Sequence, residues 1–248
     1  MVFRPSPIRV FDRALAILAE AGWRVWMTAI AAYVLPYLLG FFLIYKPLLD
    51  GSRPDLGFGT EYFLRYYGFI LWFFLVRMLA YASAGQLMYN AATGHGTGIR
   101  TMAQGLPRRL LRALPVYLPV IVTAYIGNAM WVVPGAVIAY FAAFVLPGYV
   151  LGHASIASAW REGARLRHHR NLPLVLSFAL ITAFSFAATW LLGWLNGMAH
   201  GLVTFEGASI LLALWYGVIE VIQLALLFGL YFSARHRDIS PEDTADLF

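Results

Sequence analysis

The chain has 248 residues, of which 61% are hydrophobic and only 12% are charged, and its formal net charge is +6. Soluble globular proteins carry about 25% charged residues, so this composition excludes an ordinary soluble domain and indicates a membrane protein. The sequence contains no cysteine, which excludes disulfides, thiolate metal ligands and cysteine nucleophiles. The basic residues lie in short loops beside apolar segments, a placement that favours membrane orientation over nucleic-acid binding.

The N-terminal segment, residues 6–21, has the pattern of an amphipathic helix that lies in the membrane interface. Ser6 suits the N-cap position and Pro7 the first helical position. An apolar face is expected from Ile8, Phe11, Leu15 and Leu18. We therefore predict an interfacial helix within residues 1–24. The segment before Val25 is too polar for a cleavable signal, so we expect the first span to remain in the mature protein.

Six apolar stretches follow, each close to the length of about 20 residues that crosses a bilayer. They cover residues 25–45, 68–88, 113–133, 136–151, 174–195 and 209–232. Pro134 and Gly135 leave no room for a loop between the third and fourth spans, so a tight turn is expected there. Prolines inside spans favour kinks, which we expect near Pro36, Pro119 and Pro147.

These stretches predict an all-α fold, a polytopic membrane helical bundle with six transmembrane helices and basic interfacial helices. The transmembrane domain covers residues 25–232, and residues 233–248 form an acidic, polar tail. Arginines concentrate before the odd-numbered spans and after the last one, so the positive-inside rule places both termini in the cytoplasm. We expect a multi-pass membrane protein.

The basic segments 99–112 and 153–170 are partly amphipathic, and Trp160 is available to face lipid. Contact with anionic lipid headgroups is expected from Arg108, Arg109, Arg112, Arg161, Arg165, Arg167 and Arg170. Simple topology determination explains these arginines nearly as well. Membrane lipids are thus the expected partners, a membrane-protein partner is possible, and no nucleic acid is expected.

A block in the second half of the chain resembles a known family. It contains Val133-Pro134-Gly135 at a helix end, Pro147 closing the next helix, Ser155 and Ser158 after it, and the basic entry 167–171 into the fifth span. This block is similar to bacterial inner-membrane proteins of unassigned function that resemble the membrane domain attached to some glycerophosphodiester phosphodiesterases. The usual serine-arginine pairing is replaced here by ASAWREGARL. The resemblance implies architecture and a place in the bacterial inner membrane. We do not expect the phosphodiesterase activity, because these 248 residues contain no segment that resembles the catalytic domain.

Two ionisable residues lie deep in apolar spans, Arg77 in the second and Glu220 in the sixth. At about 1.5 Å per helical residue their depths are roughly 14 and 17 Å, so they are nearly level near mid-bilayer. An isolated charge there costs at least about 2.5–3.5 kcal/mol, and a partner is therefore expected. We predict that the two residues pair across the bundle, with hydrogen-bonding support from Tyr81, Tyr216 and Gln223.

Such a pair has more than one interpretation. It can be a structural ion pair that fixes helix packing, or a polar site for a lipid headgroup, a substrate or a proton. Alternatively, Arg77 snorkels or faces a water-filled cavity. The six histidines form no convincing metal set, and neither a metal nor another cofactor is expected. The small residues Ala179, Ala183 and Ala187 form a stripe that we expect to pack inside the bundle.

The sequence leads to three functional hypotheses. The first is a non-enzymatic membrane protein that serves envelope or lipid homeostasis or acts as a subunit of a membrane complex. The second is a small transporter or permease component with a polar site at Arg77 and Glu220, which predicts a water-accessible cavity. The third, an intramembrane enzyme, ranks last because no cluster of acids or histidines is found at one interface.

Overall fold

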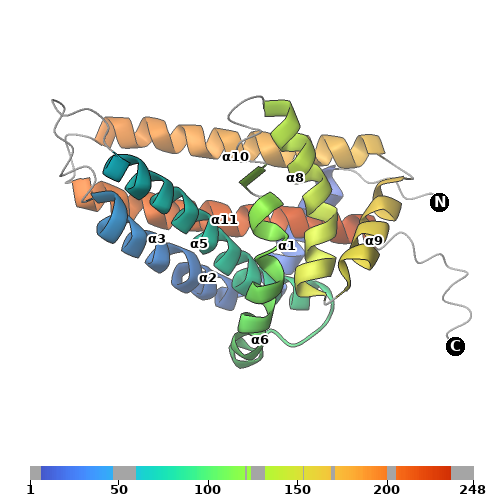
Figure 1. Ribbon diagram of the computed structural model, residues 1–248. Helices are drawn as coiled ribbons and strands as arrows, with labels where there is room; N and C mark the ends of the chain where they lie inside the picture. The colour runs from blue at the N-terminus through green and yellow to red at the C-terminus, as the bar shows by residue number, and fades with distance from the viewer. Residues whose placement is uncertain are drawn as a thin grey trace, which may run out of the picture.

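The computed structural model describes residues 7–46, 60–120, 122–123, 132–152, 154–168, 171–199 and 205–235. Within these ranges the regular elements are all helices (Figure 1). In chain order they are α1 (Pro7–Ala21), α2 (Trp23–Ala29), η1 (Ile30–Val34), α3 (Leu35–Gly40), η2 (Phe41–Tyr45), α5 (Thr60–Ala92), α6 (Ile99–Ala113), α8 (Val132–Leu146), η4 (Pro147–Leu151), α9 (Ile156–His168), α10 (Asn171–Ala199) and α11 (Phe205–Arg235). The η elements are π-helical stretches that continue their neighbouring α-helices.

The predicted all-α membrane bundle is confirmed. Among the described residues, four helical segments are long and apolar enough to cross a membrane: Trp23–Tyr45, Leu64–Ala92, Pro134–Leu151 and Gly207–Arg235. The fifth expected span falls in α10, where Leu172–Ser185 forms a shorter apolar helix. Nine of the 21 residues of the third expected span, 121 and 124–131, lie outside the described residues. The count of six spans therefore stays a prediction.

The turn expected at Pro134 is not found, whereas the helix is irregular near two of the prolines expected to cause kinks. Pro134 and Gly135 do not form a turn, because both lie in the first turn of α8. Proline is tolerated there since the first N–H groups of a helix have no intrahelical acceptor. Near Pro36 and Pro147 the helix widens into π-helical stretches, η1 just before Pro36 and η4 starting at Pro147. These stretches lie where kinks were expected. The kink expected near Pro119 stays a prediction, because residues 121 and 124–131 lie outside the described residues.

The N-terminal helix α1 packs along α11, and its apolar surface divides into two faces. Val10, Ala14, Ile17 and Ala21 are buried in the bundle core. Three of the four side chains expected on the lipid-facing side stay exposed, Ile8 at 72%, Phe11 at 54% and Leu15 at 52%. The fourth, Leu18, is half-buried and packs against the core instead. One face thus anchors the helix to the bundle while the other is free to enter lipid, as an interfacial helix requires.

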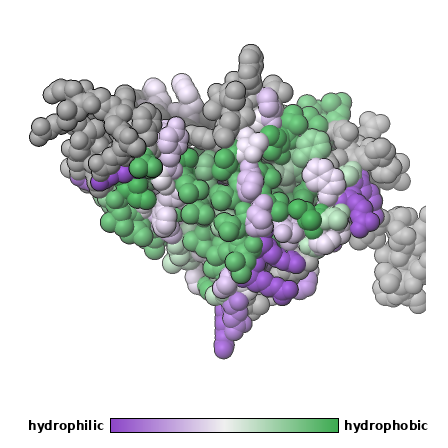
Figure 2. All heavy atoms as spheres, viewed as in Figure 1, coloured by the Kyte–Doolittle hydropathy of each residue, from purple (hydrophilic) through white to green (hydrophobic). Residues whose placement is uncertain are grey.

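The helices run between two ends of the molecule that differ in polarity. Figure 1 shows α5, α10 and α11 running lengthwise, with the start of α1 and the end of α11 at the same end. In the same view, hydrophilic surface gathers over α6 and α9, and a broad hydrophobic surface covers the centre (Figure 2). The described part of the chain therefore has the apolar middle and basic end of a membrane protein.

Two buried clusters fill the bundle on either side of its charged centre. One is aromatic-rich and joins Tyr33 and Tyr37 to Val76, Ala80 and Ala213. The other and larger cluster takes up the half of the bundle toward the basic end and includes residues of α1, α5, α8, α10 and α11. The two ionisable residues of the spans lie where these clusters meet.

Candidate functional site

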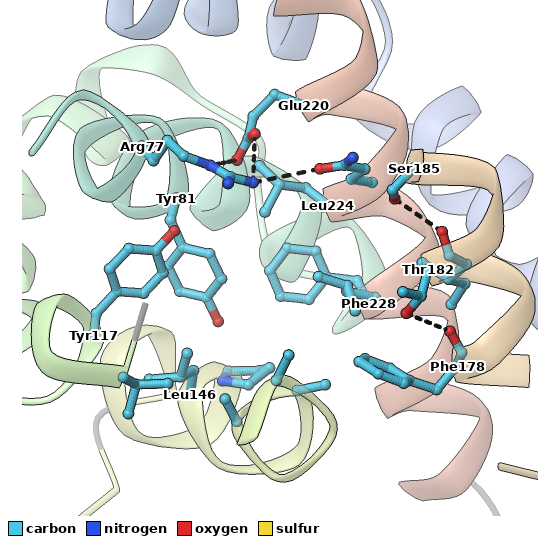
Figure 3. A pocket seen from close by; sticks show the side chains of 18 of the residues that line it. Arg77, Tyr81, Tyr117, Leu146, Phe178, Thr182, Ser185, Glu220, Leu224 and Phe228 are labelled. Atoms are coloured by element: carbon cyan, nitrogen blue, oxygen red, sulfur yellow. Dashed lines mark hydrogen bonds and ion pairs between the residues drawn. The ribbon is translucent and has the colours of Figure 1, made fainter. Parts of the chain in front are cut away.

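Arg77 of α5 and Glu220 of α11 face one another at the contact between these two neighbouring helices (Figure 3). The distance from Arg77 Nη2 to Glu220 Oε2 is 2.9 Å, and Arg77 Nε donates to Glu220 Oε1 at 3.4 Å. Each carboxylate oxygen thus accepts from a different guanidinium nitrogen, the fork geometry that gives arginine–carboxylate pairs their strength. The structure therefore brings together the two residues that the sequence places at nearly equal depth.

The pair is supported from α11 by Gln223. Its Oε1 accepts from Arg77 Nη2 at 3.4 Å, which is possible because residues three apart share a helix face. The Arg77 guanidinium also lies 5.9 Å from the ring centre of Phe73, a cation–π distance. The Glu220 side chain is 7% exposed, whereas that of Arg77 is 28% exposed. Glu220 is thus enclosed, and Arg77 keeps an open surface.

That open surface faces a cavity of about 270 Å³ between α5, α8, α10 and α11. The polar end of the cavity consists of Arg77, Glu220 and Gln223. Its remaining wall is mostly apolar and includes Leu146 of α8, Ile181 of α10, and Leu224, Leu227 and Phe228 of α11. An apolar chamber with a few polar groups at one end is typical of ligand-binding pockets.

Tyr81, one turn beyond Arg77 on α5, also lines the cavity. Its ring lies between those of Tyr117 and Phe228, and in Figure 3 its hydroxyl is directed toward the helix that carries Leu146. The side chain is 5% exposed, and its buried hydroxyl has no hydrogen-bond partner among the described residues. A buried hydroxyl without a partner costs about 1–3 kcal/mol. Tyr81 therefore does not support the charge pair as predicted.

Of the other two residues predicted to support the charge pair, one contacts it and one does not. Gln223 contacts Arg77 as expected, whereas Tyr216 packs in the aromatic cluster, with its ring centre 6.4 Å from that of Tyr37. Sequence reasoning missed Thr182 and Ser185, which line the cavity from α10 while donating to their own helix at Phe178 O and Ile181 O. Only the placement of α10 against α11 reveals them.

The arginines expected to contact lipid headgroups differ in how exposed their side chains are. Arg108, Arg161 and Arg165 are exposed, and Arg112 is half-buried, with its guanidinium 5.9 Å from the Tyr149 ring centre. The side chains of Arg167 and Arg170 lie outside the described residues. The exposed members are placed where lipid headgroups could reach them.

Arg109 differs from the expectation of lipid contact. It is 4% exposed, donates from Nε to Ala82 O at 3.0 Å, and also donates to Met102 O. Burial lowers the pKa of its guanidinium. Arg109 thus ties α6 to α5 because its fork reaches two carbonyl groups, and it is not available to a headgroup.

Two further expectations concern helix packing and metals. Ala179, Ala183 and Ala187 are exposed on α10, so the small-residue stripe does not pack inside the bundle as predicted. The reason is the rotation of α10, which buries Leu174, Ser177, Phe178 and Ile181 instead. No cluster of three potential metal-binding side chains occurs among the described residues.

Comparison with known proteins gives no match to a family model, a curated protein or a solved structure. The site must therefore be interpreted from its own geometry. That geometry consists of a neutralised charge pair at one end of a partly open apolar cavity inside a membrane bundle. It can hold an amphiphile whose polar group meets Arg77 while its apolar part lies along α8, α10 and α11.

Proposed function

We propose that this protein is a non-enzymatic membrane protein that binds a lipid or another amphiphile in the cavity beside Arg77 and Glu220. This activity would serve envelope or lipid homeostasis, alone or within a membrane complex. The observation that carries the proposal is the combination of a polar end and an apolar wall in one chamber of about 270 Å³. A non-enzymatic role is supported by the fork between Arg77 and Glu220, which engages both oxygens of the carboxylate and so disfavours its use as a general base.

We also propose a location and a family relationship for the protein. We place the protein in the bacterial inner membrane with six spans and both termini in the cytoplasm, as the arginine distribution favours. The exposed Arg108, Arg161 and Arg165 are suited to anionic headgroups at that face. The block around Val133-Pro134-Gly135 supports a relationship to the inner-membrane proteins that resemble phosphodiesterase-attached membrane domains.

Single introduced cysteines test the orientation because the natural chain has none. Lys46→Cys, at the end of η2, is expected to react with a membrane-impermeant maleimide added to cells whose outer membrane is permeabilised. Gly96→Cys, between α5 and α6, is expected to react only in inverted vesicles. The reverse labelling pattern would contradict the proposed orientation.

Filling the cavity tests its role in binding. Ala142 lines the cavity, whereas Ala183 is exposed on α10. Ala142→Leu is expected to reduce the lipid retained by the full-length protein, because the added carbons occupy the apolar chamber. The control Ala183→Leu leaves retention unchanged. Native mass spectrometry of protein released from lipid nanodiscs measures the retained lipid, and equal retention in both variants would refute cavity binding.

A small transporter is the second candidate function. It is favoured by one observation, the 28% exposure of the Arg77 side chain toward a partly open cavity. A transporter must expose the site to both sides of the membrane in turn. Thr182→Cys, on the cavity wall, is expected to react with impermeant reagents from both sides if the protein transports its ligand. Reaction from neither side would exclude this candidate.

A further inference from the structure

The donors and charges around the cavity narrow the kind of molecule that it can hold. We infer that the cavity binds an uncharged amphiphile whose head carries a hydrogen-bond acceptor oxygen, such as a long-chain alcohol or a glycerol ester. This inference rests on the proposed binding function and specifies its ligand class. Three observations support it: the charge balance of the site, its excess of donors, and the size of its apolar part.

The charge balance disfavours an anionic head. Among the described residues that line the cavity, Arg77 is the only one with a positive charge and Glu220 the only acid. Their fork leaves the site without net charge. An anionic head would therefore bring an uncompensated charge into an apolar chamber, which costs far more than a neutral polar group does. A cationic head would meet the guanidinium and has no further acid to pair with.

The donors of the site point to an acceptor on the ligand. Arg77 lines the cavity and uses Nε and Nη2 for Glu220 and Gln223, whereas its Nη1 has no hydrogen-bond partner among the described residues. The Tyr81 hydroxyl also lacks a hydrogen-bond partner within the described ranges. Both groups need an acceptor, and an alcohol, ester or carbonyl oxygen supplies one without adding charge.

The size of the cavity limits how much of the ligand it encloses. A cavity of 150 Å³ lined by apolar side chains holds one benzene, so 270 Å³ has room for about ten heavy atoms. A ten-carbon chain with a small head is therefore a suitable probe. A longer natural ligand would leave the rest of its chain in the surrounding lipid, because the cavity is partly open.

Three probes with the same chain and different heads test the inference: 1-decanol, decyl sulfate and decyltrimethylammonium. The full-length protein in nanodiscs is titrated with each probe, and bound probe is measured by native mass spectrometry. We expect 1-decanol to bind at least tenfold more tightly than either charged probe, and Ala142→Leu to remove this binding while Ala183→Leu keeps it. Tighter binding of decyl sulfate overturns the inference but leaves amphiphile binding intact. If Ala142→Leu changes the binding of none of the three probes, the proposed function itself is wrong.

Tyr81→Phe provides a variant whose effect on binding is separable from folding. Its hydroxyl has no partner in the part of the chain that the structure describes, so the loss of that group should leave the unfolding midpoint unchanged or raised. A lost hydrogen bond to ligand should weaken 1-decanol binding about 2- to 12-fold. Unchanged 1-decanol affinity in a stable Tyr81→Phe protein contradicts the assigned contact.

Glu220→Gln tests the charge balance of the site without involving Tyr81. In Glu220→Gln the Arg77 guanidinium loses its counter-charge, so the binding preference of the cavity should shift from 1-decanol toward decyl sulfate. A folded Glu220→Gln protein that keeps the original preference contradicts the charge-balance argument. Should this variant fail to fold, the comparison of the three probes on the natural chain still decides the inference.

Discussion

Glu220→Leu is expected to lower the free energy of unfolding by about 3–5 kcal/mol, because it leaves the Arg77 guanidinium in the bundle without its counter-charge. Arg77 forms two contacts with the Glu220 carboxylate and one weaker contact with Gln223. The remaining amide cannot neutralise the cation. Denaturation in mixed micelles, followed by circular dichroism, measures the change.

Two double variants distinguish the loss of the Arg77–Glu220 ion pair from a general destabilising effect of mutation. The double variant Arg77→Met with Glu220→Leu should recover most of the lost stability, since removing both charges also removes their desolvation cost. The charge-swapped double variant, Arg77→Glu with Glu220→Arg, should be more stable than either of its single changes. If the swapped protein is no better than the single variants, the two residues do not act as a direct pair.

Gly229→Val has the second largest expected effect, a loss of about 1–3 kcal/mol from overpacking. A Cβ at Gly229 would lie 2.5 Å from Val10 O and 3.1 Å from the Ala14 backbone nitrogen. Both are backbone atoms of α1, so side-chain rotation cannot relieve the clash. We expect α1 to separate from α11, which is measurable as faster amide hydrogen exchange over residues 7–21.

Gly68→Val is the matched control for this prediction. A Cβ at Gly68 meets nothing within 4 Å, and the residue also lies within a long helix, α5. Its substitution should leave exchange in α1 unchanged. If Gly229→Val and Gly68→Val behave alike, the close approach of α1 to α11 is not required for stability.

The fold class was predictable because composition and hydrophobic length act along the chain itself. Twenty apolar residues imply a membrane helix wherever they occur, and the spacing of Ile8, Phe11 and Leu15 is enough to predict an amphipathic helix. The juxtaposition of Arg77 and Glu220 was accessible for a similar reason. Depth follows from residue number in a helix, and a buried charge needs a partner of opposite sign.

The cavity and the role of Arg109 were not predictable from the sequence, because both depend on how helices rotate against one another. Arg109 resembles its exposed neighbour Arg108 in the sequence, and only the position of α6 beside Ala82 O makes it a structural clamp. The alanine stripe of α10 was misjudged for the same reason. Ala183 satisfies the spacing rule for close packing, yet its face points out of the bundle.

Photolabelling tests most directly whether an amphiphile occupies the cavity. A 1-decanol that carries a diazirine at the end of its chain would be irradiated with the full-length protein in nanodiscs, and the labelled residues identified by peptide mass spectrometry. Our account predicts labels on Leu146, Ile181 and Leu227, reduced by excess 1-decanol and by Ala142→Leu. Labels confined to exposed residues on the outside of α10, such as Leu172 and Trp190, and unaffected by either, would contradict it.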